Sequence, residues 1–143
     1  YSPKLTEIMA GAMMNLGVER GFVVSGHDNM DEFTLTGSST VSEIKDGKVT
    51  TYEVTPEQFG LSCCRLEDLQ GGDGAVNAQI TKNILSGKEQ GPKRDIILLN
   101  AGAALYIGGK ADSIKDGIAL AAQTIDSGKG LEVIENLVKL TNA

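Results

Sequence analysis

The sequence has few cysteines, and this shortage already limits what the protein can be. The two cysteines, Cys63 and Cys64, are neighbours, and adjacent cysteines rarely bridge because a disulfide would strain the peptide between them. Two thiols alone are also too few to complete a structural zinc site. The cysteine content therefore excludes a disulfide-stapled secreted domain and indicates a reduced, cytoplasmic setting.

Basic clusters and long apolar runs are also missing. The formal net charge is −6, and the sequence has no dense cluster of Lys and Arg. The surface should therefore repel nucleic acid and anionic lipid. No apolar run reaches the length of a membrane span, and the start, Tyr1-Ser2-Pro3-Lys4, is not a signal peptide. We expect neither nucleic acid nor membrane as a partner. Because residue 1 is not Met, we expect the chain to begin inside a longer protein.

Most of the chain has the spacing of helices. The 143 residues suit one domain, and 18 glycines supply many turns and stops. Apolar residues recur every three or four positions in five stretches, which predicts five helices. The stretch at residues 91–107 is apolar on nearly all sides, so we expect that helix to be central. The helices should lie within residues 2–17, 73–86, 91–107, 112–125 and 131–138.

Three short segments have the composition of strands. Phe22–Val24 lies between glycine and serine residues and is typical of a buried strand in a parallel sheet. Ser39–Ile44 and Val49–Val54 flank Asp46-Gly47, a strong signal for a two-residue hairpin turn. A single buried strand needs hydrogen-bonding neighbours, so we expect further strands from an absent N-terminal half or another chain. The predicted fold class is α/β, rich in helix, with an incomplete sheet.

An acidic segment follows the predicted buried strand. Asp28, Asp31 and Glu32 lie within five residues, and ligands of open α/β sheets gather just beyond the C-terminal ends of strands. Mg²⁺ prefers carboxylate oxygens and is often held by one or two carboxylates together with substrate phosphates. Such an ion can neutralise the charge on a departing diphosphate. The alternative interpretation is that these acids are ordinary solvated loop residues.

Two other motifs carry weaker signals. His27 is the single histidine, and no partner for a catalytic triad is evident beside it, which favours a surface or supporting role. Gly71-Gly72-Asp73-Gly74 precedes a predicted helix and could cradle a phosphate at the helix N-terminus. A tight turn with Asp73 as the helix cap explains the same residues more simply.

Several blocks of the sequence, in order, resemble the anthranilate phosphoribosyltransferases. The family typically reads Val-Val-His-Gly-x-Asp-Gly-Leu-Asp-Glu where this chain has residues 23–32, Val-Val-Ser-Gly-His-Asp-Asn-Met-Asp-Glu. The likeness covers nearly the whole chain, and ordered blocks are more specific than any one motif. Further matching blocks are residues 52–60, 69–73, 77–78, 84–87, 91–95, 99–101 and 125–128.

The resemblance implies an enzyme that transfers a ribose phosphate from phosphoribosyl pyrophosphate to anthranilate in tryptophan biosynthesis. The family's Asp-Glu pair binds Mg²⁺ on the pyrophosphate side, and it matches Asp31 and Glu32. Residues 1–143 would be the C-terminal part of an α/β domain of the nucleoside phosphorylase/phosphoribosyltransferase type. The family's Gly-Thr-Gly-Gly-Asp phosphate loop, Lys-His-Gly segment, anthranilate-binding Arg and dimer-forming helices would lie outside this chain, which alone should have little activity.

The chain departs from the family pattern at three positions of the acidic segment. Ser25 stands where the family usually has His, and Asn29 and Met30 replace Gly and Leu. Asn tolerates the left-handed backbone that Gly often supplies, so the loop shape should be retained. Two alternatives stay open: a related pyrimidine nucleoside phosphorylase, which shares the fold, and a non-catalytic fragment that only associates with a partner.

Overall fold

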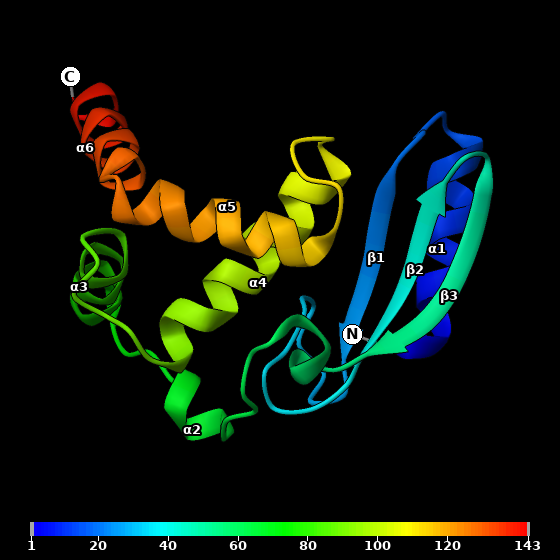
Figure 1. Cartoon of the computed structure of the whole chain (residues 1–143), viewed down its shortest axis with the longest axis horizontal. Helices are drawn as coiled ribbons and strands as arrows, with labels where there is room; N and C mark the ends of the chain where they lie inside the picture. The colour runs from blue at the N-terminus through cyan, green and yellow to red at the C-terminus, as the bar shows by residue number, and fades with distance from the viewer. Residues whose placement is uncertain (1, 143) are drawn as a thin grey trace.

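The chain folds into a small sheet backed by one helix and a separate layer of helices. The computed structural model describes residues 2–142, and Figure 1 shows α1 and the strands on one side and α3 to α6 on the other. The elements, in chain order, are α1 (Pro3–Asn15), β1 (Gly21–Gly26), β2 (Ser39–Lys45), β3 (Lys48–Val54), the 3-10 helix η1 (Pro56–Phe59), α2 (Leu66–Leu69), α3 (Gly74–Leu85), α4 (Pro92–Ile107), α5 (Ile114–Asp126) and α6 (Lys129–Thr141).

The three strands form one antiparallel sheet in the order β1-β2-β3, so that β2 is central and β1 is an edge. The predicted hairpin is confirmed. Asp46 and Gly47 have φ angles of +51° and +72°, the left-handed pair that a tight two-residue turn requires. The sequence signal was specific because few residue pairs adopt this conformation without strain.

The expectation that Phe22–Val24 is a parallel strand without a partner in this chain was wrong. The strand pairs antiparallel with β2, in a register that sets Val24 opposite Val41, and its valines and phenylalanine are only half-buried. The sequence could not reveal this because a short apolar run has the same composition in either kind of sheet.

Helix α1 covers one face of the sheet, but not with the residues that its apolar spacing suggested. Thr6 and Ala10 are buried, while the larger apolar side chains face outward. The sheet surface below is small and polar, and Ser42 Oγ donates a 2.9 Å hydrogen bond to Thr6 Oγ1. Small residues therefore let the helix approach closely. The exposed apolar side chains of α1 are Leu5, Ile8, Met9 and Leu16.

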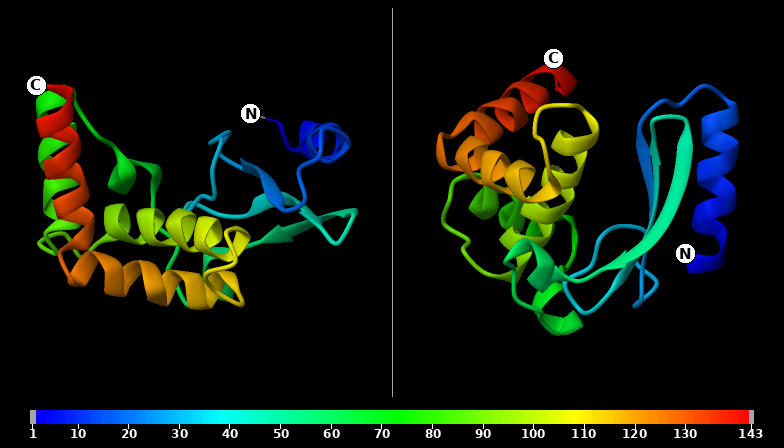
Figure 2. Two further views of the ribbon diagram at one scale, coloured as in Figure 1. Left: turned by 90° about the horizontal axis from the view of Figure 1, so that it is seen from above. Right: turned by 45° about the vertical axis from the view of Figure 1, so that its right-hand side comes forward.

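The helical layer is built around α4, as its apolar sequence predicted. Its buried side includes Ile96, Leu99 and Ala103, and it crosses α5 closely. Ser113 caps the N-terminus of α5, and its Oγ accepts from the Asp116 backbone nitrogen at 3.1 Å. In Figure 2 α3 and α6 stand together at the far end of this layer. Helix α6 has the predicted apolar residues, yet none of its described residues is fully buried.

The segment between the sheet and the helices is mostly irregular. Thr55 caps a helix there, and its backbone nitrogen donates to Gln58 Oε1 at 2.9 Å. The helix is a single 3-10 turn, because Gly60, with φ +82°, reverses the chain directly after Phe59. Within the described residues, no helix has the length and apolar character needed to cross a membrane.

One shared core joins the sheet to the helices. Phe33, Leu35 and Val41 pack with apolar residues of α4 and α5. A polar contact reinforces this junction at its edge: Glu43 on β2 accepts hydrogen bonds from Tyr106 on α4 at 2.8 Å and from Tyr52 on β3 at 2.9 Å. The core therefore fixes β1 and α4 on opposite sides of the acidic loop that connects β1 to β2.

Candidate functional site

The acidic loop begins with a tight turn at the end of β1. Gly26 N donates to the Met30 carbonyl at 2.9 Å, and Asn29 N donates to the Gly26 carbonyl at 3.0 Å. Asn29 has φ +67°, so the expectation that Asn would keep the left-handed conformation usual for Gly is confirmed. The turn directs the chain after Met30 toward α4.

Asp28 holds this turn together and does not face the cleft with the other two acids. Its Oδ2 accepts from Thr34 Oγ1 at 2.7 Å and from Thr36 Oγ1 at 2.6 Å, and its Oδ1 accepts from Met30 N at 3.1 Å. Partial burial acts to raise the pKa of the Asp28 carboxyl, but these hydrogen bonds outweigh it and hold the pKa below its usual value. Asp28 is therefore a structural carboxylate.

The far end of the loop is bonded to α4 through Asn100. Phe33 N donates to Asn100 Oδ1 at 3.0 Å, and Asn100 Nδ2 donates to the Phe33 carbonyl at 3.0 Å. The Phe33 ring is buried and meets Phe22 edge to face, with 5.8 Å between centroids. Asp31 and Glu32 thus lie between two fixed residues, Met30 and Phe33.

Asp31 and Glu32 line a cleft of about 310 Å³ between β1 and α4. Asp31 is exposed, and Glu32 is half-buried. The wall of the cleft is apolar apart from the two acids and Asn100. The remaining lining residues are Phe22, Val24, Phe33, Ala103, Ala104 and Ile107.

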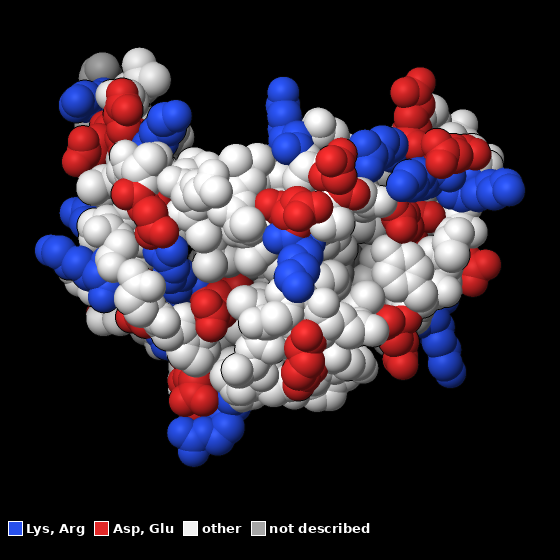
Figure 3. Space-filling model, viewed as in Figure 1, with Lys and Arg blue, Asp and Glu red and all other residues white. Residues whose placement is uncertain are grey.

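The two acids are electrostatically uncompensated. Burial raises the pKa of the Glu32 carboxyl above its usual value, and the negative charges of Asp31 and Asp28 raise it further. Within residues 2–142 neither Asp31 nor Glu32 takes part in an ion pair, and no Lys or Arg lines the cleft. On the face shown in Figure 3, by contrast, acidic and basic side chains are interspersed.

This donor set fits a hard divalent cation held jointly by protein and ligand. Among residues 2–142 no group of three or more His, Cys, Asp or Glu side chains converges on one point, so the chain offers no closed metal cage. Two neighbouring carboxylates of unbalanced charge are instead what Mg²⁺ uses when substrate phosphates and water complete its coordination. Asp31 and Glu32 are the residues that would hold it.

The structure also shows where the other sequence candidates lie. His27 is exposed, with its ring packed beside Gly37, and it does not line the cleft. Ser25 is buried on the opposite face of the sheet from Val24, because successive strand residues alternate. Its Oγ has no hydrogen-bond partner among the described residues. The departure from the family pattern at Ser25 therefore lies on the face of the sheet that is turned away from the cleft.

The simpler interpretation of the Gly71–Gly74 loop is confirmed. Asp73 Oδ1 caps α3 by accepting from Val76 N at 2.9 Å. The Asn77 side chain occupies the loop, since it accepts from Gly72 N at 2.9 Å and donates to the Gly72 carbonyl at 2.9 Å. The Gly72 amide is therefore already bonded within the chain.

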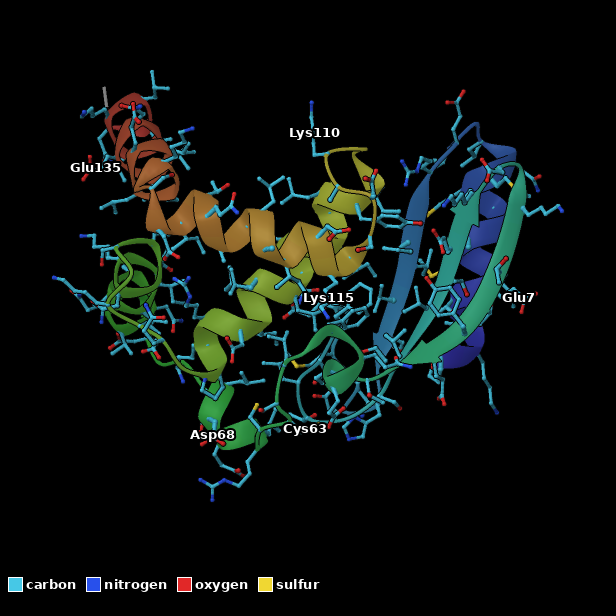
Figure 4. The ribbon with its side chains drawn as sticks, in the orientation of Figure 1. Glu7, Cys63, Asp68, Lys110, Lys115 and Glu135 are labelled. Atoms are coloured by element: carbon cyan, nitrogen blue, oxygen red, sulfur yellow. The ribbon has the colours of Figure 1, made fainter. Side chains whose placement is uncertain are left out.

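Cysteine chemistry does not contribute to the site. Cys63 lies near α2 (Figure 4) and donates a hydrogen bond from Sγ to Glu57 Oε1 at 3.0 Å. That bond, together with slight burial and the charge of Glu57, raises the pKa of the Cys63 thiol to about 11. Burial likewise raises the pKa of the Cys64 thiol. Both groups stay protonated, and so unreactive, near neutral pH.

Two larger grooves lie elsewhere. One of about 550 Å³ runs between α3 and α6, and one of about 580 Å³ lies beside the turns at Gly17 and Gly47. Neither is lined by two acids adjacent in the sequence. We place the candidate site by its chemistry and not by volume.

Asn100 is the residue of the site that reasoning from the sequence missed. Its signal was present, because an amide in the middle of an almost wholly apolar helix needs hydrogen-bond partners. The partner, Phe33, lies 67 positions away in the sequence, and no local pattern connects the two.

Comparison with known proteins identifies the chain as part of a transferase domain. The chain belongs to the glycosyl transferase family, because residues 1–131 match the model of that family's a/b domain. Its relatives include the anthranilate phosphoribosyltransferases of Desulfosudis oleivorans, 50% identical over 143 residues, and Citrifermentans bemidjiense, 54% identical over 142 residues. The chain covers 42% and 40% of those two proteins, so it spans about two fifths of their length.

Solved structures of the same kind superpose on the chain. It matches anthranilate phosphoribosyltransferase from Thermus thermophilus with a TM-score of 0.90 and 39% identity, over 100% of this chain and 42% of that one. The Saccharomyces cerevisiae enzyme in complex with PRPP and Mg matches with a TM-score of 0.83 and 30% identity, over 94% of this chain and 39% of that one. The expected resemblance and the partial α/β fold are confirmed.

Proposed function

We propose that residues 1–143 are the C-terminal part of the α/β domain of an anthranilate phosphoribosyltransferase. The protein would transfer the 5-phosphoribosyl group from phosphoribosyl pyrophosphate to anthranilate, a step of tryptophan biosynthesis. The observation that carries the proposal is the adjacent, uncompensated pair Asp31 and Glu32 at the mouth of the cleft. It occurs in a chain that is 50% identical, along its whole length, to an enzyme of that name.

In this proposal Asp31 and Glu32 hold Mg²⁺ on the side of the pyrophosphate. The bound ion would neutralise negative charge on the departing pyrophosphate. The chain contributes a fixed loop that keeps both carboxylates at the cleft mouth. The apolar wall lowers the local polarity, which strengthens the attraction between the carboxylates and a cation. A relative whose structure was determined with PRPP and Mg supports this choice of ligands.

The rest of the machinery would lie outside this chain. The family resemblance assigns the phosphate loop and the anthranilate-binding Arg to the N-terminal half, so these 143 residues alone should show little or no turnover. We also propose that the complete protein is a cytoplasmic homodimer, joined through helices of that half.

The test uses the full-length protein that contains this chain. Disappearance of anthranilate is followed in the presence of phosphoribosyl pyrophosphate and increasing Mg²⁺. We expect the double variant Asp31→Ala/Glu32→Ala to lose about 100-fold or more in Mg²⁺-dependent turnover, because electrostatic groups that act on the developing charge have effects of that size. The matched control is Glu67→Ala/Asp68→Ala, which removes the adjacent acid pair of α2, outside the cleft.

Near-normal kinetics of the cleft variant at limiting Mg²⁺, or an equal loss in the control, would contradict the metal role. A second assay, with pyrimidine nucleoside and inorganic phosphate, separates the proposal from a nucleoside phosphorylase. Phosphorolysis without phosphoribosyl transfer would assign the chain to that related activity instead.

A further inference from the structure

The side-chain amide of Asn100 is a polar contact between the acidic loop and the helical layer. Asn100 lies on α4 and lines the same cleft as Asp31 and Glu32. It bonds both backbone groups of Phe33, the residue directly after Glu32, with two distances of 3.0 Å. The C-terminal neighbour of the acid pair is therefore hydrogen-bonded to a helix that lies in the core.

The orientation of the amide is determined by its partners. Nδ2 also donates to the Ile96 carbonyl, one turn earlier on α4, at 3.0 Å. Both hydrogens of Nδ2 are thereby used, and Oδ1 accepts from Phe33 N. Exchanging the amide oxygen and nitrogen would break all three hydrogen bonds, so only one orientation satisfies them.

The other end of the acid pair is fixed independently. Met30 bonds through its N–H to Asp28 and through its carbonyl to Gly26 N. Only Asp31 and Glu32 separate Met30 from Phe33, so loss of the Asn100 contact would release the backbone at one of the two ends and leave the buried Phe33 ring as its anchor. Two like charges held side by side repel each other, and a freed loop would relax by moving the carboxylates apart.

We propose that Asn100 is a positioning residue, which holds Asp31 and Glu32 together at the cleft through its hydrogen bonds to Phe33 and so sets the affinity of the site for a divalent cation. This inference rests on the proposed function, because it assigns a support to the metal-holding pair. The predicted partner of the site is Mg²⁺ accompanied by a diphosphate.

The chain offers a matched control for the loss of such a contact. Asn77 bonds both backbone groups of Gly72 in the same way, at 2.9 Å each, but it lies on α3 and does not line the cleft. A purely structural role would let either variant lower stability without changing its response to metal. A positioning role makes only the Asn100 variant sensitive to metal.

The experiment compares Asn100→Leu with Asn77→Leu in the full-length protein. The Mg²⁺ concentration for half-maximal transferase activity is measured, and Mg²⁺ is titrated calorimetrically in the presence of inorganic pyrophosphate. We expect Asn100→Leu to raise the half-maximal Mg²⁺ concentration and the calorimetric Kd for Mg²⁺ by about tenfold each. Residues that orient metal ligands have effects of about 10–100-fold. Asn77→Leu should change them less than about twofold, the usual result away from such contacts. Asn100→Ala provides the same test if leucine prevents folding.

A double-mutant cycle identifies the route of the effect. In a Glu32→Gln background the additional effect of Asn100→Leu on Mg²⁺ dependence should shrink to less than about twofold, because the residue acts through that carboxylate. Unchanged Mg²⁺ dependence of Asn100→Leu, or an undiminished effect in the Glu32→Gln background, would overturn the inference. If the wild-type protein makes no phosphoribosyl anthranilate, the proposed function fails, and the calorimetric titration still decides the role of Asn100.

Discussion

Gly102 on α4 and Gly117 on α5 lie against each other where the two helices cross. A Cβ atom added at Gly102 would be 2.6 Å from the backbone nitrogen of Ile118, and one added at Gly117 would meet the carbonyl of Gly102. Both glycines are buried. The close crossing sets the position of α4, and therefore of Asn100, relative to the rest of the helical layer.

We expect Gly102→Ala to lower the free energy of unfolding of the full-length protein by about 1–3 kcal/mol, because overpacking a tight contact forces the backbone to shift. The loss should appear although Ala favours a helix over Gly by about 1 kcal/mol. Urea denaturation followed by circular dichroism measures it. Gly11→Ala is the control: an added Cβ atom at Gly11, inside α1, meets nothing within 4 Å, so its stability should stay equal or rise.

The carboxyl of Asp28 should make stability depend on acidic pH. Its pKa is lower in the folded state than its usual value, so its contribution is fully present above the unfolded pKa of about 4. The contribution is lost as the pH falls through the lower folded pKa. The difference in unfolding free energy between wild type and Asp28→Asn should therefore be constant from neutral pH down to about pH 5 and shrink below it. A difference that does not change with pH would contradict this.

Tyr52 predicts the opposite dependence at alkaline pH. Burial, together with its hydrogen bond to Glu43, raises the pKa of the Tyr52 hydroxyl well above its usual value. The unfolded chain releases this proton near pH 10 while the folded chain keeps it, so stability falls as the pH rises beyond about 10. We expect Tyr52→Phe to remove part of that fall. Denaturation midpoints of both proteins at pH 9, 10 and 11 test it.

The 143 residues expressed alone should associate. The apolar side chains of Ile8 on α1 and Leu16 at its C-cap are 68% and 87% exposed, and exposed apolar surface promotes association. We expect size-exclusion chromatography to show oligomers, and the double variant Ile8→Lys/Leu16→Lys to shift them toward monomer. A monomeric wild-type chain with cooperative unfolding would contradict the interpretation of this surface.

Local features could be predicted from the sequence because they depend on neighbouring residues. Asp46-Gly47 specified its hairpin, Asp73 capped α3, and the apolar run after Pro92 formed the central helix. The acids of the site were assigned through family resemblance; the structure places Asp31 and Glu32 at a cleft, and their metal role stays a prediction.

Relationships across the chain could not be predicted in the same way. Whether β1 runs parallel or antiparallel to β2 cannot be read from the composition of the strand. The side of α1 that meets the sheet was decided by Thr6 bonding Ser42, where apolar spacing favoured the larger residues. The contact between Asn100 and Phe33 likewise depends on how two distant segments are brought together.

The order of the strands has a practical consequence. Because β1 is at the margin of the sheet, one row of its backbone amides and carbonyls is open to an added strand, and such a row can template pairing with another polypeptide. A charged residue placed on Gly21–Gly26 should therefore reduce pairing of this edge with another polypeptide.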